Sequence, residues 1–441
     1  MQKRVLSSAI ALALTALASG TALAQSSVTI YGNIDVSVDR VKRDAGDRLL
    51  PNVGPLVAGN DQLSNKASTT RVGPDLSSQS SLGFRGTEDL GGGYKGNFVL
   101  EGQAGADNGA LLRDGRLFGR QAYAGLTTPY GEFRAGRQYA PIFFSSAVIT
   151  TERFGGTDQF LEGGLSNSLN IRWDNALTYS LQLGGFRGQL GYSPNAGASD
   201  LVNANRGSGA SDSSGSILGG NNSGASTEKT SGRGRSWGAF GMYAIDDLTV
   251  SAGYSTTDFK GVPVNLLTGT ASAYNAVTAP LFMFNLGDYS VWNLGAKYAF
   301  KDLGLTLTGA FGRATYDITN ASPLASNPAG FGITNGDLEV SSLVLGARYE
   351  IGAVAFLGQW SETKFRNEGR GKNRGYTLGA EYSLSKRTTV YTRWSQLDDK
   401  GIGPAVVFPA TGIREVPPMT NAGLTPNGKT TLLALGVRHS F

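Results

Sequence analysis

Residues 376–387 read Tyr-Thr-Leu-Gly-Ala-Glu-Tyr-Ser-Leu-Ser-Lys-Arg. Apolar residues occupy every second position from Tyr376 to Leu384, and small or polar residues lie between them. Because successive side chains of a β-strand point to opposite faces, this period of two predicts a strand with one apolar face and one polar face. The polar triplet 385–387 then predicts a tight turn into the next strand. One such hairpin fits a soluble sandwich as well as a membrane barrel.

The same alternation recurs along the chain from residue 27 onward. We count about sixteen segments of this kind, an even number in the range of outer-membrane barrels. Short turns alternate with long connections. The short turns are 89–93, 128–131, 184–185, 246–247, 301–304, 350–352 and 385–387. The long connections are 41–76, 106–114, 139–168, 195–232, 258–287, 317–336, 367–371 and 399–428. A sandwich has no reason to sort its connections by length onto one end, so we predict an all-β fold, a transmembrane antiparallel 16-stranded β-barrel.

Aromatic residues mark the positions where the predicted strands meet the short turns. All of them fall on the apolar side of the alternation: Tyr243, Tyr298, Phe300, Tyr349 and Tyr382. Amphipathic rings are enriched at the interface between membrane and water, so these residues indicate an interfacial girdle.

The start of the chain has the features of a secretion signal. Lys3 and Arg4 precede an apolar run that is too short to span a bilayer, and Thr21-Ala22-Leu23-Ala24 gives a small-residue cleavage pattern. We therefore expect residues 1–24 to be a signal peptide and residues 25–441 to form the barrel. The formal charge is +5, and removing the two signal cations leaves +3.

The composition argues against several classes of function. The chain has no cysteine and one histidine, so no metal cluster, cofactor site or thiol nucleophile is expected. No basic run supports nucleic-acid binding. A barrel enzyme needs a base to activate serine or water, and the one histidine, His439, falls on the lipid-facing side of the last segment. No catalytic residues are therefore expected.

The last segment, 430–441, places Leu433, Leu435 and Val437 on one face and ends on Phe441. An open sheet edge in lipid would leave backbone groups unpaired, so a barrel must seal its last strand against its first. A strand that runs to the final residue fits this requirement.

The sequence resembles the general porins of Gram-negative bacteria, most closely the β-proteobacterial type. Seven segments carry the resemblance in this order: SVTIYG (27–32), LGFRGTEDLGGG (82–93), FGRQAYAGL (118–126), GRQ (136–138), RWDN (172–175), LSKRT (384–388) and GVRHSF (436–441). The resemblance implies an exported homotrimer in the lipid of the outer membrane, with water-filled channels for passive diffusion of small hydrophilic solutes and ions. It also implies that the third external loop, 139–168, folds inward and narrows the pore. Phe441 resembles the recognition signal for the barrel-assembly machinery.

Alternation places four arginines on the lumen wall: Arg85, Arg120, Arg134 and Arg172. The neighbours expected to face lipid are Leu82, Phe84, Tyr123, Phe133, Ile171 and Trp173. The resemblance implies that acidic residues of the third loop face this wall, and the loop carries Glu152, Asp158 and Glu162. Opposed charges across a narrow passage favour polar and ionic solutes.

Two features limit the expected selectivity. The chain has Ser81 where related porins often have an arginine, so we expect a weak preference for anions or almost none. Arg137 lies at the hinge between strand and loop, where alternation fails, so its direction stays open. An alternative role for the four arginines is to solvate the wall or brace the loop.

Two other functions stay compatible with the pattern. One is a substrate-specific porin, because specificity carried by loops leaves no readable motif. The other is an adhesion or binding barrel that acts through its long external loops.

Overall fold

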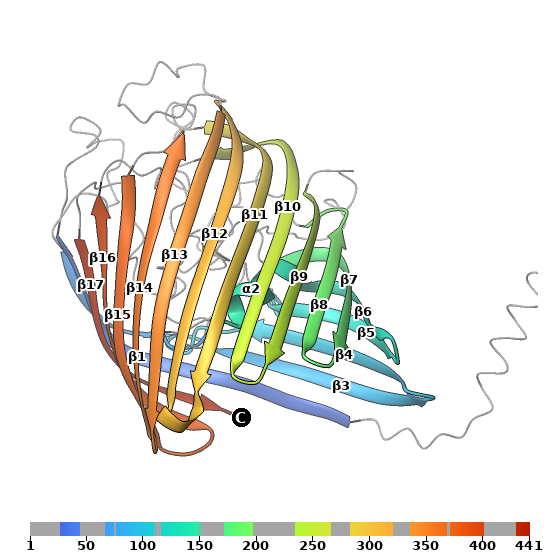
Figure 1. The fold of residues 1–441 in the computed structure, drawn as a ribbon, viewed down its shortest axis with the longest axis horizontal. Helices are drawn as coiled ribbons and strands as arrows, with labels where there is room; N and C mark the ends of the chain where they lie inside the picture. Colours follow the sequence, from blue (N-terminus) through green and yellow to red (C-terminus); the bar gives the residue numbers. More distant parts are fainter. Residues whose placement is uncertain are drawn as a thin grey trace, which may run out of the picture.

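The computed structural model describes residues 27–44, 67–74, 76–109, 111, 116–149, 151, 172–196, 234–265, 283–320, 336–367, 371–400 and 429–441. Seventeen strands in these ranges form one antiparallel sheet (Figure 1). The first nine are β1 (Ser27–Asp44), β2 (Ala67–Pro74), β3 (Ser81–Gly91), β4 (Tyr94–Gln103), β5 (Gln121–Thr128), β6 (Gly131–Tyr139), β7 (Arg172–Leu183), β8 (Phe186–Ser193) and β9 (Arg235–Ile245). The others are β10 (Leu248–Asn265), β11 (Met283–Phe300), β12 (Leu305–Asn320), β13 (Gly336–Ile351), β14 (Val354–Asn367), β15 (Gly371–Ser383), β16 (Thr388–Lys400) and β17 (Lys429–Ser440). One α-helix, α2 (Pro141–Ala147), and one 3-10 turn, η4 (Lys301–Leu303), complete the described elements.

The sheet closes on itself because β1 pairs with β17, from Asn33 opposite Ser440 to Asp44 opposite Lys429. Both β2 and β3 pair with β1, β2 along its second half and β3 along its first half. These two strands therefore share one place, and the seventeen strands occupy sixteen places around the barrel. The predicted 16-stranded antiparallel barrel is confirmed.

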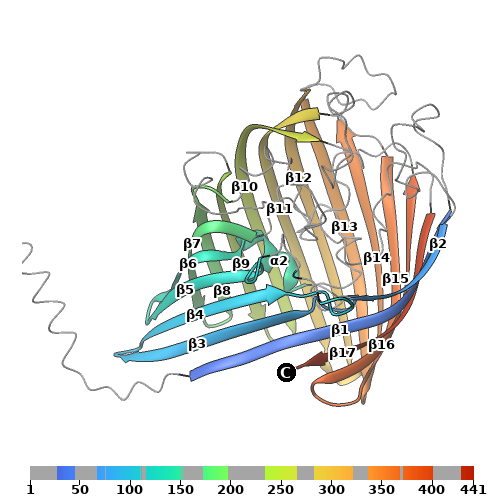
Figure 2. The same cartoon turned by 180° about the vertical axis from the view of Figure 1, so that it is seen from behind.

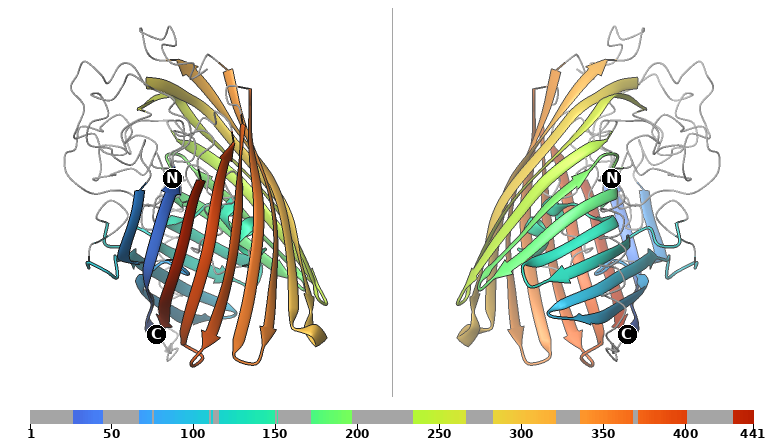
Figure 3. Two further views of the ribbon diagram at one scale, coloured as in Figure 1. Left: turned by 90° about the vertical axis from the view of Figure 1, so that its left-hand side faces the viewer. Right: turned by 90° about the vertical axis from the view of Figure 1, so that its right-hand side faces the viewer.

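The wall of the barrel is uneven in height. β10 to β16 form the tall side in Figure 1, and Figure 2 shows the low side formed by β3 to β8. β14 has 14 residues, whereas β5 has only 8. Figure 3 shows the first and last strands side by side at the seam. α2 lies within the barrel, where it packs against β9, β10 and β11.

The two faces of the strands follow the predicted alternation. Leucine, valine and aromatic side chains are exposed on the outer face, and polar side chains are buried on the inner face. All five residues of the predicted girdle are exposed outward: Tyr243, Tyr298, Phe300, Tyr349 and Tyr382. His439 lies on the outer face, as predicted, and contacts Thr388 at 2.9 Å. No helix in the described ranges is long and apolar enough to cross a membrane.

Three of the predicted connections are shorter in the structure, because strands extend into them. The region 41–76 contains the end of β1 and the whole of β2. β10 and β11 extend into the region 258–287, where they stay paired from Val262–Leu286 to Asn265–Met283. β12 likewise runs past residue 317 to Asn320. The end of β10 is interrupted by Gly261 and Pro263, and register shifts on both sides of β11 break the alternation there. Pairing with the neighbouring strand still extends these strands.

The turn after β3 explains one run of glycines. Gly91, Gly92 and Gly93 have φ values of 82°, 61° and 83°. L-residues with side chains rarely adopt this left-handed region, so glycine is needed at three successive positions.

Candidate functional site

Arg120 lies directly before β5 and reaches into the lumen toward Glu101 of β4. Its Nε donates to Oε1 of Glu101, and its Nη1 donates to Oε1 of Gln79. The Tyr31 hydroxyl donates to Oε2 of Glu101 at 2.7 Å. Glu101 therefore holds Arg120 against the wall. Sequence reasoning missed Glu101, although it shares the inward parity of β4 with Gln103.

Arg134 lies on the inner face of β6, as predicted. Its Nη2 donates to Oε2 of Glu132 at 2.6 Å, and its Cζ lies 4.9 Å from the centre of the Tyr123 ring. Tyr123 therefore faces the lumen, and the prediction that it faces lipid was wrong. β5 begins at Gln121, so Arg120 precedes the strand and cannot be used to count its alternation. Phe133 is exposed on the outer face, as predicted.

Arg172 begins β7 and is 4% exposed. Its Nη2 donates to the Tyr139 hydroxyl at 2.7 Å, and its Cζ lies 4.3 Å from the ring centre. The neighbouring Trp173 is 1% exposed and packs beside Gly191, so the prediction that it faces lipid was wrong. A register shift between β6 and β7 and the left-handed Asn175 (φ 53°) interrupt the alternation here. Ile171 lies outside the described residues.

Arg137, whose direction the sequence left open, braces the wall. Its Nε donates to the carbonyl oxygen of Gly119 at 2.7 Å, and its Nη1 donates to Oδ1 of Asp174. Arg116 also bonds both oxygens of Asp174, at 3.1 Å each. One carboxylate therefore fixes two guanidinium groups.

Arg85 differs from the other arginines of this wall because it is exposed to the lumen. Its Cζ lies 5.1 Å from the centre of the Tyr31 ring, and it makes no ion pair with another described residue. Arg187 on the inner face of β8 is similar, with its Cζ 5.9 Å from the Phe144 ring. We define the first basic cluster as Arg85, Arg116, Arg120, Arg134, Arg137 and Arg172. The cluster has six guanidinium groups and three carboxylates, those of Glu101, Glu132 and Asp174. Arg116, Arg120, Arg134 and Arg137 form ion pairs with these carboxylates.

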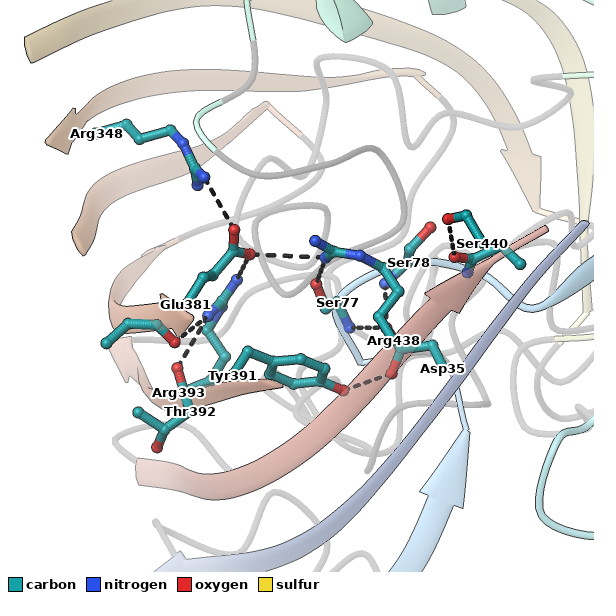
Figure 4. A network of polar contacts seen from close by, with 12 residues as sticks. Asp35, Ser77, Ser78, Arg348, Glu381, Tyr391, Thr392, Arg393, Arg438 and Ser440 are labelled. Atoms are coloured by element: carbon teal, nitrogen blue, oxygen red, sulfur yellow. Dashed lines mark hydrogen bonds and ion pairs between the residues drawn. The ribbon is translucent and has the colours of Figure 1, made fainter. Parts of the chain in front are cut away.

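A second basic cluster, Arg348, Arg393 and Arg438, surrounds Glu381 on the wall of β13 and β15–β17 (Figure 4). Oε1 of Glu381 accepts from Nη2 of Arg393 at 2.7 Å, and Oε2 accepts from Nη2 of Arg348 at 2.9 Å. Nη1 of Arg438 lies 3.6 Å from Oε1. Arg393 is fully buried and Arg438 is 3% exposed. Arg348 has a second partner, Glu350, at 2.8 Å.

The sequence did not reveal this second cluster, because its members lie up to 90 residues apart in the chain. The side chain of each member points inward, however, and each member lies between two residues whose side chains point outward. Arg438 lies between Val437 and His439, for example. A search for inward charges on adjacent strands would have found them once the strand order was known.

The start of the third external loop folds inward, as the resemblance implied. Ser251 of β10 donates through Oγ to the carbonyl oxygen of Ser145 in α2 at 2.6 Å. Farther along, Thr151 Oγ1 lies 2.9 Å from Thr308 Oγ1 on β12. Glycines on the inner wall make room for this contact. A Cβ on Gly253 would overlap Ser145, and a Cβ on Gly295 would overlap Ile149.

We expect the substitution Gly295→Leu to displace the start of the loop from the wall. The new side chain must occupy the space that Ile149 fills, and both cannot fit. The altered loop position should change single-channel conductance in planar bilayers. Gly241→Leu is the matched control, because a Cβ there meets only the flexible Phe186 ring at 3.5 Å. Conductance that is the same in Gly295→Leu and wild type would contradict this docking.

The remaining predicted residues have two outcomes. The loop acids Glu152, Asp158 and Glu162 lie outside the described residues. Phe441 pairs with Gly32 through two backbone hydrogen bonds, both 3.1 Å, so the last residue seals the first strand. Among the described residues, no three His, Cys, Asp or Glu side chains converge in a way that could hold a metal.

Comparisons with known proteins agree with this architecture. Residues 9–401 match the protein-family model described as Gram-negative porin. An outer membrane porin protein of Bordetella pertussis is 28% identical over 98% of this chain and 99% of its own length. The solved anion-selective porin from Comamonas acidovorans superposes with a TM-score of 0.61 at 22% identity, over 95% of this chain and 100% of that one. OmpT of Vibrio cholerae, solved in a trimer form, gives a TM-score of 0.58 at 15% identity, over 94% of this chain and 99% of that one.

Proposed function

Because the chain belongs to the Gram-negative porin family, we propose that its passive outer-membrane channel has a weak preference for anions. The observation that carries this proposal is the surplus of guanidinium groups on the lumen wall. The first basic cluster has six against three carboxylates, and the second has three against Glu381 and Glu350. Fixed charges that line a narrow passage attract counter-ions and repel co-ions.

The partners of each arginine decide how much it contributes to the potential in the channel. Arg116, Arg120, Arg134 and Arg137 lie against carboxylates, which cancel much of their charge. Arg85 and Arg187 are exposed to the lumen without such a partner among the described residues. These two side chains are the strongest candidates for direct contact with passing anions. The loop acids Glu152, Asp158 and Glu162 oppose them in our proposal and keep the preference weak.

The zero-current potential of the channel in a salt gradient tests this proposal. We expect a small potential of the sign set by chloride when purified protein in a planar bilayer separates unequal KCl solutions. Higher salt should reduce the preference, because screening lengths fall from about 10 Å at 0.1 M to about 3 Å at 1 M. A clear preference for potassium would contradict the proposal.

The low side of the barrel supports assembly as a homotrimer. Eight residues of a tilted strand such as β5 span about 20 Å, less than the apolar band of about 25 Å. The 14 residues of β14 span about 35 Å. The low wall is therefore better suited to contact with other protomers than with lipid. Light scattering of the detergent-solubilised protein should give three chains, and a monomer would overturn this assembly.

We propose a signal at each end of the chain, one for export and one for assembly of the barrel. Residues 1–24 act as the signal peptide, so the N-terminal sequence of the mature protein should begin at Gln25. Phe441 acts as the signal for the barrel-assembly machinery, and its pairing with Gly32 supports a role at the final closure.

A further inference from the structure

The connection between β2 and β3 has more residues than the facing part of β1. On β1, Pro74 lies opposite Val36 and Ser81 lies opposite Asn33. Between these two pairs, β1 has only residues 34 and 35. The chain that connects β2 to β3 has six residues, 75–80, over the same interval. Four residues are in excess, which is far more than the single extra residue of an ordinary β-bulge. Residues 76–80, which we call the inner segment, leave the sheet toward the lumen.

Asp35 fastens the inner segment from the inner face of β1. Its Oδ2 accepts hydrogen bonds from the backbone of Ser77 at 3.0 Å and of Ser78 at 2.7 Å. Its own backbone nitrogen donates to Oγ of Ser80 at 3.0 Å, and its Oδ1 accepts from the Tyr391 hydroxyl (Figure 4). Asp35 is fully buried, and a buried carboxylate is costly unless it is hydrogen-bonded. The two backbone donors reach Asp35 only while the inner segment stays inside.

Apolar packing holds the same segment by an independent interaction. Leu76 is 1% exposed and belongs to one buried cluster. The other members of that cluster are Val41, Tyr391, Leu397, Leu432 and Ala434. These residues lie on the inner face of β1, β16 and β17, where they would otherwise face water. Leu76 covers them, so withdrawal of the segment would expose an apolar patch in a polar lumen.

The inner segment also joins the two basic clusters. Ser77 Oγ accepts a hydrogen bond from Nη1 of Arg438 in the second cluster. Gln79 Oε1 accepts one from Nη1 of Arg120 in the first cluster. The carbonyl oxygen of Gln79 is itself fixed by Nδ2 of Asn33 at 3.2 Å. The segment therefore fixes the positions of two guanidinium groups that lie more than 300 residues apart in the chain.

The position of the segment in the barrel gives it a function. In the closed sheet, β10 lies eight places from β1, half of the sixteen. α2 packs against β10 and its neighbours, so the inner segment and α2 project from opposite walls. We propose that the inner segment is a second, permanently inserted narrowing element of the channel. It sets the upper size of permeant solutes and positions Arg120 and Arg438.

A cysteine at Ser78 tests this placement without removing a described side-chain contact. The chain has no cysteine, so one introduced thiol can be labelled alone. Ser78 is half-buried. Labelling Ser78→Cys with a bulky methanethiosulfonate reagent should lower single-channel conductance by roughly half. Ser385→Cys, in the exposed turn before β16, should label without this loss. Full labelling of Ser78→Cys with unchanged conductance would overturn the proposal.

Removing the segment should have the opposite effect. Deletion of residues 76–79 leaves two residues opposite 34 and 35, so β2 and β3 can join in register. The variant should admit larger sugars in liposome swelling and conduct roughly 1.5-fold more current. Asp35→Ala should change the sugar limit in the same direction. Asp39→Ala is the matched control, because this buried inward carboxylate on β1 pairs with Arg71 instead.

Two measurements distinguish an effect on the size limit for solutes from an effect on the charge selectivity of the channel. Gln79→Ala frees one contact of Arg120 and should shift the zero-current potential while the sugar limit stays unchanged. An assembled deletion variant with the wild-type sugar limit would overturn the proposal. If the deletion or Asp35→Ala prevents assembly, the labelling of Ser78→Cys decides, since that variant keeps both fastenings.

Discussion

Glu381→Gln should destabilise the barrel by about 3 to 5 kcal/mol, the usual cost of removing one partner from a buried ion pair. Glu381 is 5% exposed and is the shared carboxylate of Arg348, Arg393 and Arg438. The amide keeps the shape of the side chain but leaves buried guanidinium groups without a neutralising charge. Urea unfolding in detergent micelles, followed by tryptophan fluorescence, measures the change.

Glu350→Gln is the matched control for this prediction. Glu350 also pairs with Arg348, at 2.8 Å, but it is 60% exposed. Exposed ion pairs contribute about 0 to 1 kcal/mol, so this variant should unfold close to wild type. The double variant Glu381→Gln, Arg393→Met should recover only part of the loss, because it removes one of the three guanidinium groups that share this carboxylate. Equal stability of Glu381→Gln and Glu350→Gln would show that burial does not determine how much each carboxylate stabilises the barrel.

The fold was readable from the sequence because the bilayer imposes one simple pattern. Positions that face the apolar band of the bilayer favour apolar residues, so Leu433, Leu435 and Val437 alternate visibly with small and polar neighbours. The pattern fails where a strand does not alternate between apolar and polar residues. β2 has one branched apolar side chain, Val72, and the end of β10 is interrupted by Gly261 and Pro263. Pairing with a neighbouring strand fixes those segments, and no local signal marks it.

The lumen wall was readable only in part for a related reason. Alternation correctly assigned Arg85 and Arg134 to the inner face. It was wrong for Tyr123 and Trp173, because a strand start and a register shift moved the count by one. The second basic cluster depends on contacts among strands of the last hundred residues, and the inner segment depends on contacts of residues 76–80 with β1, β16 and β17. A sequence pattern reports the face of each residue, whereas partners such as Ser77 and Arg438 become neighbours only when the barrel closes.

The double substitution Arg85→Glu, Arg187→Glu should convert the weak anion preference into a cation preference. Both guanidinium groups face the lumen without a carboxylate partner among the described residues, so their charge is the least compensated on the wall. Reversal of both changes the lumen charge by four units, which cancels the surplus of seven guanidinium groups over three carboxylates that Arg187 and the first basic cluster have together. The loop acids of our proposal then leave an excess of negative charge. Zero-current potentials in a KCl gradient should therefore change sign.

The control must make the same kind of charge change away from the channel. Arg366 is 57% exposed and lies on the outward parity of β14, near the external end. Arg366→Glu reverses a guanidinium charge outside the lumen, so it should leave the potential close to wild type. Arg172→Gln should also have a small effect, because Arg172 is buried against Tyr139. If Arg366→Glu shifts the potential as strongly per charge as the lumen pair, selectivity follows the net charge of the protein. A sign change confined to Arg85 and Arg187 would instead place the selective field at exposed, unpaired guanidinium groups of the lumen wall.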